Sequence, residues 1–235
     1  MIVRNRRPTV IAAPLRKQVI EELRSAIISF EYLPDQRLIE RDLCERFDVS
    51  RTVIREALRG LEAEGLVGLV PNRGPVVSSV SRVEAGNLYE VREALESLAA
   101  RCCAMRATPA QKRKLARALK QVGLSFAKRE LPGELTAKDD FYRVLCEGAA
   151  NPVIASTLRS ITFRVQMLRG VSLRTPGRAQ ESLAELTNLV KAIEEGDADA
   201  AAAYAAEHVR NAGAAAFQQL SLVEEEQVRG QAAAE

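Results

Sequence analysis

The spacing of apolar residues divides the chain into two parts. Between residues 36 and 65 apolar positions recur at helical spacing, and two apolar, β-branched segments follow at 66–70 and 76–80. From residue 81 onward there is no strand-like alternation, alanine and leucine dominate, and Pro or Gly breaks recur. The pattern predicts a mostly α protein, with a small N-terminal domain over residues 1–80 and an all-helical bundle of about six helices over residues 81–235.

The N-terminal part contains two short helical stripes on either side of a turn. Asp48 interrupts the first stripe, and Ser50 is a good N-cap, so a second helix is expected to begin at Arg51. Its apolar side is predicted to hold Val53, Ile54, Ala57, Leu58 and Leu61, which leaves Arg51, Thr52, Arg55 and Arg59 on the other side. A short basic helix face of this kind suits the DNA major groove.

A hairpin is expected directly after this helix. Gly65 is placed to end the helix, and the two apolar segments flank Pro71-Asn72-Arg73-Gly74-Pro75, so the tip is basic. A helix over Pro14–Phe30 is predicted to support the unit, behind a basic lead at Met1–Ala13. Surface arginines are usually only solvated, but the cap, the arginine face and the basic hairpin together favour a DNA-binding winged helix-turn-helix.

Three segments of this part resemble the winged helix-turn-helix of GntR-family transcription regulators: residues 34–40 (PDQRLIE), 49–58 (VSRTVIREAL) and 64–67 (EGLV). The family usually has glycine where Asp35 stands and proline where Val53 stands, and neither position is expected to face DNA. The resemblance implies that DNA is contacted by Arg41, Ser50, Arg51, Thr52, Arg55, Asn72, Arg73 and Gly74.

The C-terminal part has its own helical pattern. A helix over residues 82–106 carries Leu88, Val91, Leu95 and Leu98 at spacings of three and four, which indicates an apolar face. The last helix begins near Asp197 and is so rich in alanine that close helix contacts are expected. This part resembles the FCD ligand-binding domain of the FadR subgroup of GntR regulators, through residues 89–96, 140–145, 151–152, 181–186, 192–197 and 208–209.

Members of that subgroup commonly bind a divalent metal through an Asp and a His one turn apart and two later histidines. The corresponding positions here are Lys138, Tyr142, Leu186 and His208, and His208 is the only histidine in the chain. A Zn or Ni site needs three or four converging N, S or O ligands. The resemblance therefore implies that the family's metal site is lost, and no cofactor is expected.

Two interpretations of the altered pocket remain open. In the first, Lys138 replaces the metal's charge as the anchor of an anionic effector, joined by Arg92, Tyr142, Arg164 and His208. Leu186 then lines the same effector pocket. In the second, Lys138 is solvated, Tyr142 and Leu186 fill the old site, and His208 is an ordinary core residue.

Composition narrows the class of protein. The net charge is only +3, so DNA affinity has to come from locally clustered arginines. The four cysteines form no CxxC pair and are expected to be buried thiols in a reducing cytoplasm. No apolar run is long enough to span a bilayer, so no membrane association is expected. One late histidine leaves no Ser/His/Asp or Cys/His arrangement, and no Gly-rich phosphate loop is present, so the protein is not expected to be an enzyme.

These features predict a cytoplasmic, homodimeric transcription regulator. Two copies are expected to bind a palindromic double-stranded DNA operator as a repressor, and a small carboxylate, organic or aromatic, is expected to release them. An acyl-CoA effector is the alternative. A helical scaffold that binds other proteins is a further alternative, although it would leave the hairpin unexplained.

Overall fold

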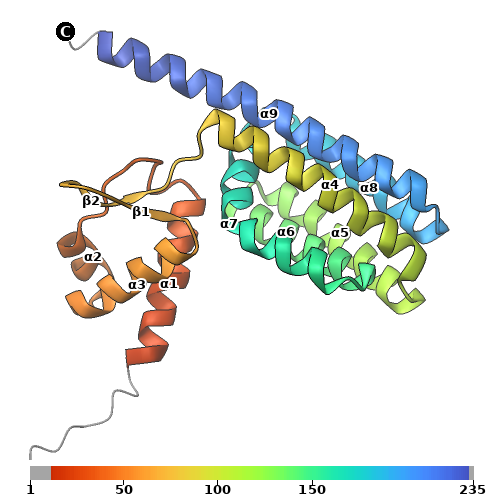
Figure 1. Cartoon of the computed structure of the whole chain (residues 1–235), viewed down its shortest axis with the longest axis horizontal. Helices are drawn as coiled ribbons and strands as arrows, with labels where there is room; N and C mark the ends of the chain where they lie inside the picture. The colour runs from red at the N-terminus through yellow and green to blue at the C-terminus, as the bar shows by residue number, and fades with distance from the viewer. Residues whose placement is uncertain (1–11, 233–235) are drawn as a thin grey trace, which may run out of the picture. The chain divides into compact units, whose positions relative to one another are not determined.

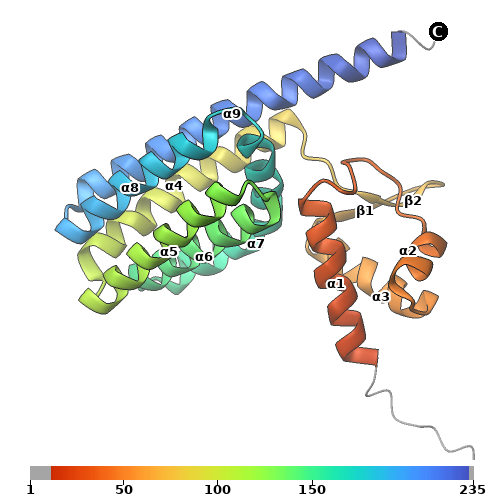
Figure 2. The same cartoon turned by 180° about the vertical axis from the view of Figure 1, so that it is seen from behind.

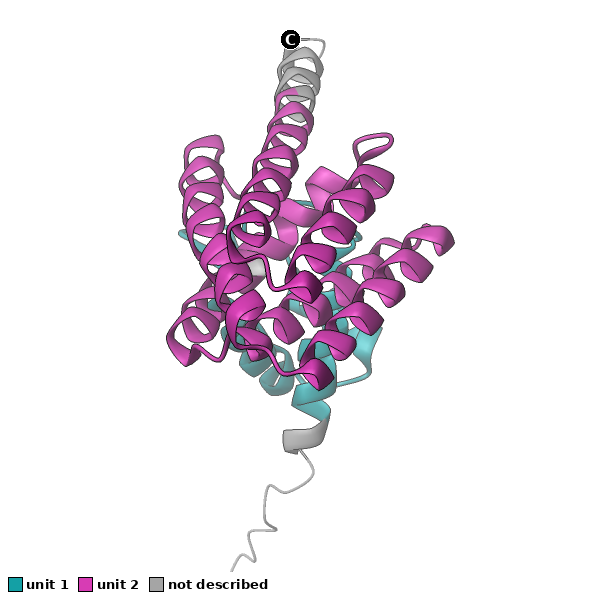
Figure 3. Cartoon of the chain, turned by 90° about the vertical axis from the view of Figure 1, so that its right-hand side faces the viewer, with its two compact units in different colours: residues 1–79 teal, residues 80–235 magenta. Residues whose placement is uncertain are grey.

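The structure is a computed structural model that describes residues 12–232. Side chains are described for residues 15–221, except at position 163. Most of the predicted basic lead therefore lies outside the described residues. The chain divides into two compact units, residues 1–79 and 80–235, which are coloured separately in Figure 3.

The first unit is a winged helix-turn-helix. Its elements are α1 (Ala12–Ile28), α2 (Glu40–Phe47), α3 (Arg51–Ala63), β1 (Val67–Val70) and β2 (Gly74–Val77). The Ser50 side chain accepts a hydrogen bond from the Val53 backbone N–H, which confirms the predicted cap and the start of α3. Gly65 has φ +78°, a conformation that suits glycine, and it follows the end of α3 as predicted. Leu23, Ile54 and Leu61 lie in the apolar core of the unit.

The wing differs in register from the predicted hairpin. Its strands are antiparallel, with Val70 opposite Gly74 and Val67 opposite Val77, so Gly74 and Pro75 belong to β2 rather than to the tip. Proline has no N–H to donate to a neighbouring strand. The backbone of Pro75 faces the segment before α2, where its carbonyl accepts a hydrogen bond from the Leu38 N–H. The segment that precedes α2 thus pairs with β2, a contact that hairpin patterning alone does not reveal.

The second unit is a bundle of helices, as Figures 1 and 2 show from opposite sides. Within the described residues its elements are α4 (Arg82–Arg106), α5 (Pro109–Lys128), α6 (Leu131–Ala149), α7 (Pro152–Leu173), α8 (Arg178–Glu195) and α9 (Ala198–Ala232). This confirms the predicted fold class and the predicted number of helices. None of the described helices is long and apolar enough to cross a membrane.

Helices α4 and α9 lie side by side (Figures 1 and 2), and both contribute to two apolar clusters. One cluster includes Ala99 and Ala205, and the other includes Leu88 and Ala212. The predicted close contacts of the alanine-rich helix are confirmed, since a Cβ on Gly213 would lie 3.3 Å from the Tyr89 ring. Between the two clusters, α4 and α9 carry buried polar residues.

The predicted apolar face of α4 is only partly correct. Leu88 is buried, but Val91 and Leu98 are each 43% exposed. The buried side of α4 holds Arg92 and Glu96 instead. Apolar residues on α4 therefore lie on both sides of the helix, and periodicity cannot tell which side faces the bundle.

Gly148 on α6 lies against Cys103 of α4. A Cβ at this position would be 2.6 Å from Cys103 Sγ, and Cys103 is fully buried. We expect Gly148→Ala to reduce the free energy of unfolding by about 1–3 kcal/mol, because the added carbon overpacks the core. Urea denaturation followed by circular dichroism measures this change.

Gly133, on the same helix, is the matched control because nothing lies within 4 Å of its added Cβ. Gly133→Ala is expected to be neutral or slightly stabilising. Adding Cys103→Ala to Gly148→Ala should recover part of the loss. Equal effects of the two glycine substitutions would contradict the proposed contact.

Candidate DNA interface and effector site

The outer face of α3 is basic and open. Ile54, Ala57, Leu58 and Leu61 are buried, as predicted, while the opposite side exposes Arg51, Thr52, Arg55 and Arg59. Asp48 adopts a left-handed conformation with φ +50° at the end of α2, which makes the tight turn into α3. Free N–H groups at the start of α3 and the arginine side chains together favour contact with phosphates and base edges.

Arg55 is held by a partner that the sequence analysis did not identify. Its Nε lies 2.9 Å from Glu40 Oε1 and 3.0 Å from Glu40 Oε2. Both of these hydrogen bonds use Nε, so the terminal nitrogens of the guanidinium can donate to a guanine or a phosphate. Glu40 begins α2, so this ion pair also joins the two helices of the motif.

The remaining predicted DNA contacts are also at the surface. Arg41 is 73% exposed and its Nε lies 3.2 Å from Asp42 Oδ1. In the wing tip, Asn72 has φ +62° and Arg73 donates from Nη2 to the Asp35 carbonyl at 3.1 Å. Arg73 is thereby fixed at the base of the tip, with the rest of its guanidinium exposed.

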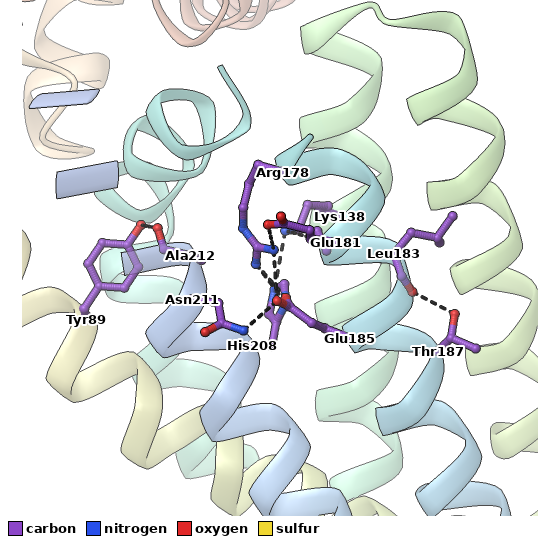
Figure 4. A network of polar contacts seen from close by, with 11 residues as sticks. Tyr89, Lys138, Arg178, Glu181, Leu183, Glu185, Thr187, His208, Asn211 and Ala212 are labelled. Carbon is purple, nitrogen blue, oxygen red and sulfur yellow. Dashed lines mark hydrogen bonds and ion pairs between the residues drawn. The ribbon is translucent and has the colours of Figure 1, made fainter. Parts of the chain in front are cut away.

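In the helical unit, the four positions that the resemblance aligns with metal ligands are all buried. Lys138 and Tyr142 lie one turn apart on α6, Leu186 lies on α8 and His208 on α9. Lys138 Nζ donates to Ser182 Oγ at 3.1 Å and lies 3.5 Å from His208 Nε2 (Figure 4). The lysine is therefore not solvated, and its amine is used inside the bundle.

Glu185 determines which ring nitrogen of His208 carries the proton. Its Oε2 lies 2.5 Å from His208 Nδ1, and Arg178 donates to both of its oxygens at 3.0 and 2.6 Å (Figure 4). Burial lowers the pKa of His208 to about 3, so the ring is neutral. The Nδ1–H then donates to Glu185, and Nε2 accepts from Lys138.

Burial, followed by the neighbouring guanidiniums of Arg169 and Arg92, lowers the pKa of Lys138 well below its usual range. Burial raises the pKa of Glu185, but hydrogen bonds from His208 and Arg178 outweigh this effect and lower the pKa to about 2. Glu185 is therefore an ionised partner for Arg178, as a buried guanidinium requires.

The residues at these positions do not fit a divalent metal. Among the described residues, no group of three or more His, Cys, Asp or Glu side chains is placed to hold an ion. Asp139 accepts from Arg169 at 2.5 Å, and Asp140 accepts from Arg143 at 3.0 Å, so neither turns toward His208. Leu186 offers no ligand, and Lys138 Nζ lies beside the only histidine.

A second cluster of buried polar side chains lies next to the cluster around His208. Arg92 Nε donates to Glu96 Oε1 at 2.9 Å, and Arg169 Nη2 lies 3.8 Å from the same oxygen. The Arg169 guanidinium stacks on the Tyr142 ring, 4.2 Å from the ring centre. Several buried polar atoms here have no hydrogen-bond partner among the described residues: Arg92 Nη1 and Nη2, Glu96 Oε2, Tyr142 Oη and Arg169 Nε.

Arg164 does not join this group. It lies at the surface of α7 and donates to Glu84 at 3.1 Å, which corrects the expectation that it faces the effector pocket. The inward side of α7 carries Val165, Leu168 and Arg169, and Arg164 lies outside it. The spacing of these apolar neighbours is the signal that could have identified Arg169.

A cavity of about 760 Å³ opens between α6 and α7, a typical size for a ligand site. Glu96, Tyr142 and Arg169 form its buried end, and Arg143 and Glu147 lie at its exposed end. Of the predicted effector residues, Tyr142 lines this cavity. Arg92, Lys138, Leu186 and His208 lie outside its lining.

Comparison with known proteins agrees with this architecture. Residues 15–77 match the family described as bacterial regulatory proteins, gntR family, and residues 87–211, more than half of the chain, match the FCD domain. The chain therefore belongs to the GntR family of bacterial transcription regulators and carries an FCD domain. This confirms the resemblance found in the sequence.

Individual relatives are distant but cover most of the chain. The protein is 26% identical over 197 residues to the HTH-type transcriptional repressor RspR of Escherichia coli K12, over 84% of this chain and 86% of that protein. It is 27% identical over 189 residues to the Nta operon transcriptional regulator of Aminobacter aminovorans, over 78% and 85%. A putative GntR regulator from Rhodococcus sp. RHA1 has a similar structure, with a TM-score of 0.75 and 25% identity over 88% of this chain and 99% of that one.

If α3 reads DNA, its outer arginines carry the sequence preference. We expect Arg51→Ala and Arg55→Ala each to reduce the preference for operator over random DNA by about 1–3 kcal/mol. Fluorescence anisotropy with both DNAs measures the ratio. Arg117→Ala, an exposed arginine on α5, is the control. Unchanged operator binding in both α3 variants would refute the assignment of this helix.

Glu40 is expected to position Arg55. Glu40→Gln removes a negative charge near the DNA, so the affinity for random DNA should rise. The preference for operator should fall, because the guanidinium of Arg55 is no longer held by an ion pair. Glu22→Gln, at an exposed glutamate on α1 whose side chain accepts from Gln18, removes an equal charge without touching Arg55. Equal changes in the two variants would show that charge alone is responsible.

Proposed function

We propose that this GntR-family regulator is a repressor that binds a palindromic operator as a homodimer and is released by a small carboxylate. The DNA-binding part rests on the exposed arginines of α3. The effector part rests on one observation, the unpaired buried polar atoms beside the α6–α7 cavity. An unpaired buried polar group costs about 1–3 kcal/mol, so such a cluster favours a bound partner.

The proposed effector site differs from the site expected from the sequence in the residue that binds the carboxylate. Arg169 takes the place given to Lys138, because it lines the cavity and keeps an unpaired Nε. Tyr142 lies between the two polar groups, with its ring 6.5 Å from that of His208 and stacked under Arg169. Arg92, Lys138, Leu186 and His208 form the packed layer around it, and Arg92 adds positive charge near the cavity.

The sign of regulation is supported by the name of one relative, RspR, which is described as a repressor. In the proposed mechanism the recognition helices of two copies enter successive major grooves. Effector binding changes the helical unit so that the spacing of the two helices no longer matches the operator.

A gel shift at physiological salt, with the DNA upstream of the protein's own gene, tests the function. We propose that a discrete complex forms and resists random competitor DNA, and that a small carboxylate weakens it. Absence of any sequence-preferring complex would refute the function. Release by long acyl-CoA but by no small acid would replace the effector class with acyl-CoA.

The homodimer is proposed to form through α4. Val91, Leu98 and Met105 are spaced by seven residues, so they lie on one side of the helix, and they are 43%, 43% and 66% exposed. A line of large exposed apolar side chains is unfavourable in a monomer. A second copy of the same helix would bury it.

We expect Leu98→Glu to convert the dimer into a monomer, because the charge falls at the middle of this line. Light scattering coupled to size exclusion measures the mass, and operator affinity should fall with it. Leu124→Glu, at a 50% exposed leucine on α5, is the control. A Leu98→Glu protein that stays dimeric would place the interface elsewhere.

We expect chelation with EDTA to leave the melting temperature of the purified protein unchanged, because Lys138 and Leu186 stand where ligands are needed. Thermal denaturation before and after chelation provides the measurement. Stoichiometric divalent metal retained through purification would contradict this expectation.

A further inference from the structure

The buried end of the α6–α7 cavity presents polar atoms of opposite character. Glu96 Oε2 is an acceptor, Arg169 Nε is a donor, and the Tyr142 hydroxyl can act as either. All three residues line the cavity, and none of these atoms has a hydrogen-bond partner among the described residues. A ligand with only one kind of polar group would leave part of this set unsatisfied.

The ionisation of Glu96 and Tyr142 limits the class of ligand that fits these atoms. Burial raises the pKa of Glu96, but the guanidiniums of Arg92 and Arg169 outweigh this effect and lower it, so Glu96 is an ionised acceptor. Burial, followed by the neighbouring Glu96 carboxylate, raises the pKa of Tyr142, so its hydroxyl keeps its proton and can donate. A ligand carboxylate is then matched to Arg169 and Tyr142, and Glu96 needs a separate donor from the ligand.

That donor is better neutral than charged. Arg92 Nε lies 2.9 Å and Arg169 Nη2 lies 3.8 Å from Glu96 Oε1, so two positive groups already surround this carboxylate. A ligand ammonium would be repelled by both guanidiniums, whereas a hydroxyl would not. The cavity wall beyond this end includes Ala155, Leu158 and Val165, which suits an apolar substituent.

We propose that the effector is a hydroxycarboxylate, with a hydroxyl next to the carboxylate and an apolar or aromatic substituent. This inference rests on the proposed effector function and specifies its ligand. The carboxylate accepts from Arg169 Nε and the Tyr142 hydroxyl, and the ligand hydroxyl donates to Glu96 Oε2. These atoms are shielded in the ligand-free chain, so binding includes a side-chain shift of Arg169 away from the Tyr142 ring.

Matched acids that differ by one hydroxyl test the proposal on the full-length protein. 3-Phenyllactate and 3-phenylpropanoate share the carboxylate and the ring, and phenylalanine replaces the hydroxyl by an ammonium. Calorimetry is expected to show that phenyllactate binds about tenfold or more tightly than either analogue, because a site built around a hydroxyl rejects its absence. Equal binding of phenyllactate and phenylpropanoate, or binding of neither, would overturn the proposal, and so would preferred binding of phenylalanine.

Tyr142→Phe separates ligand binding from folding. The hydroxyl has no partner in the free chain, so its removal should leave the melting temperature unchanged or raise it. The affinity for phenyllactate should fall about three- to tenfold, the loss expected for one hydrogen bond. Tyr204→Phe, at a partly exposed tyrosine on α9, is the matched control. An unchanged affinity in Tyr142→Phe would exclude Tyr142 from the site.

Failure of this inference is distinguishable from failure of the proposed function. The same protein samples are assayed by gel shift, with and without each acid. Operator binding that no hydroxycarboxylate weakens, but that another carboxylate does, would overturn the inference and keep the regulator. Operator binding weakened by phenyllactate at lower concentration than by phenylpropanoate would support both.

Discussion

Charged groups that leave water must be paired, and the helical unit is organised by this constraint. The buried charged side chains form two sets of ion pairs. Arg92 on α4 and Arg169 on α7 pair with Glu96 on α4, and Arg178 pairs with Glu185 on α8, which also contacts His208 on α9. Removing one member would leave a buried charge without its partner, which is strongly destabilising. The polar layer therefore fixes how these helices align, while apolar packing at either end supplies most of the favourable burial.

The DNA-binding unit depends on simpler and more local interactions, and it could largely be predicted from sequence. The cap at Ser50 and the glycine after α3 act within a few residues, so α3 was located correctly. The wing was less accurate because its register depends on the Arg37 segment pairing with β2, about 40 residues away along the chain. The partner of Arg55 was missed for the same reason, since Glu40 lies on another helix.

In the bundle, Pro, Gly and capping residues identified the helices well, because they act on the backbone of their own segment. The inward faces could not be predicted as well. Arg164 and Arg169 are the same residue type on one helix. The spacing of apolar residues on α7 favours Arg169 as the interior one, but the partner Glu96 lies on another helix, far away in the sequence. Buried arginines resemble exposed ones in a sequence, since their partners come from elsewhere in the chain.

The interior position of Lys138 has a consequence for how the protein matures. A protein whose core includes a metal ion must bind that ion before its fold is complete. Here the group beside His208 is the amine of Lys138, which is part of the polypeptide. In a bundle without a metal, as we propose for this protein, assembly would not have to wait for an ion.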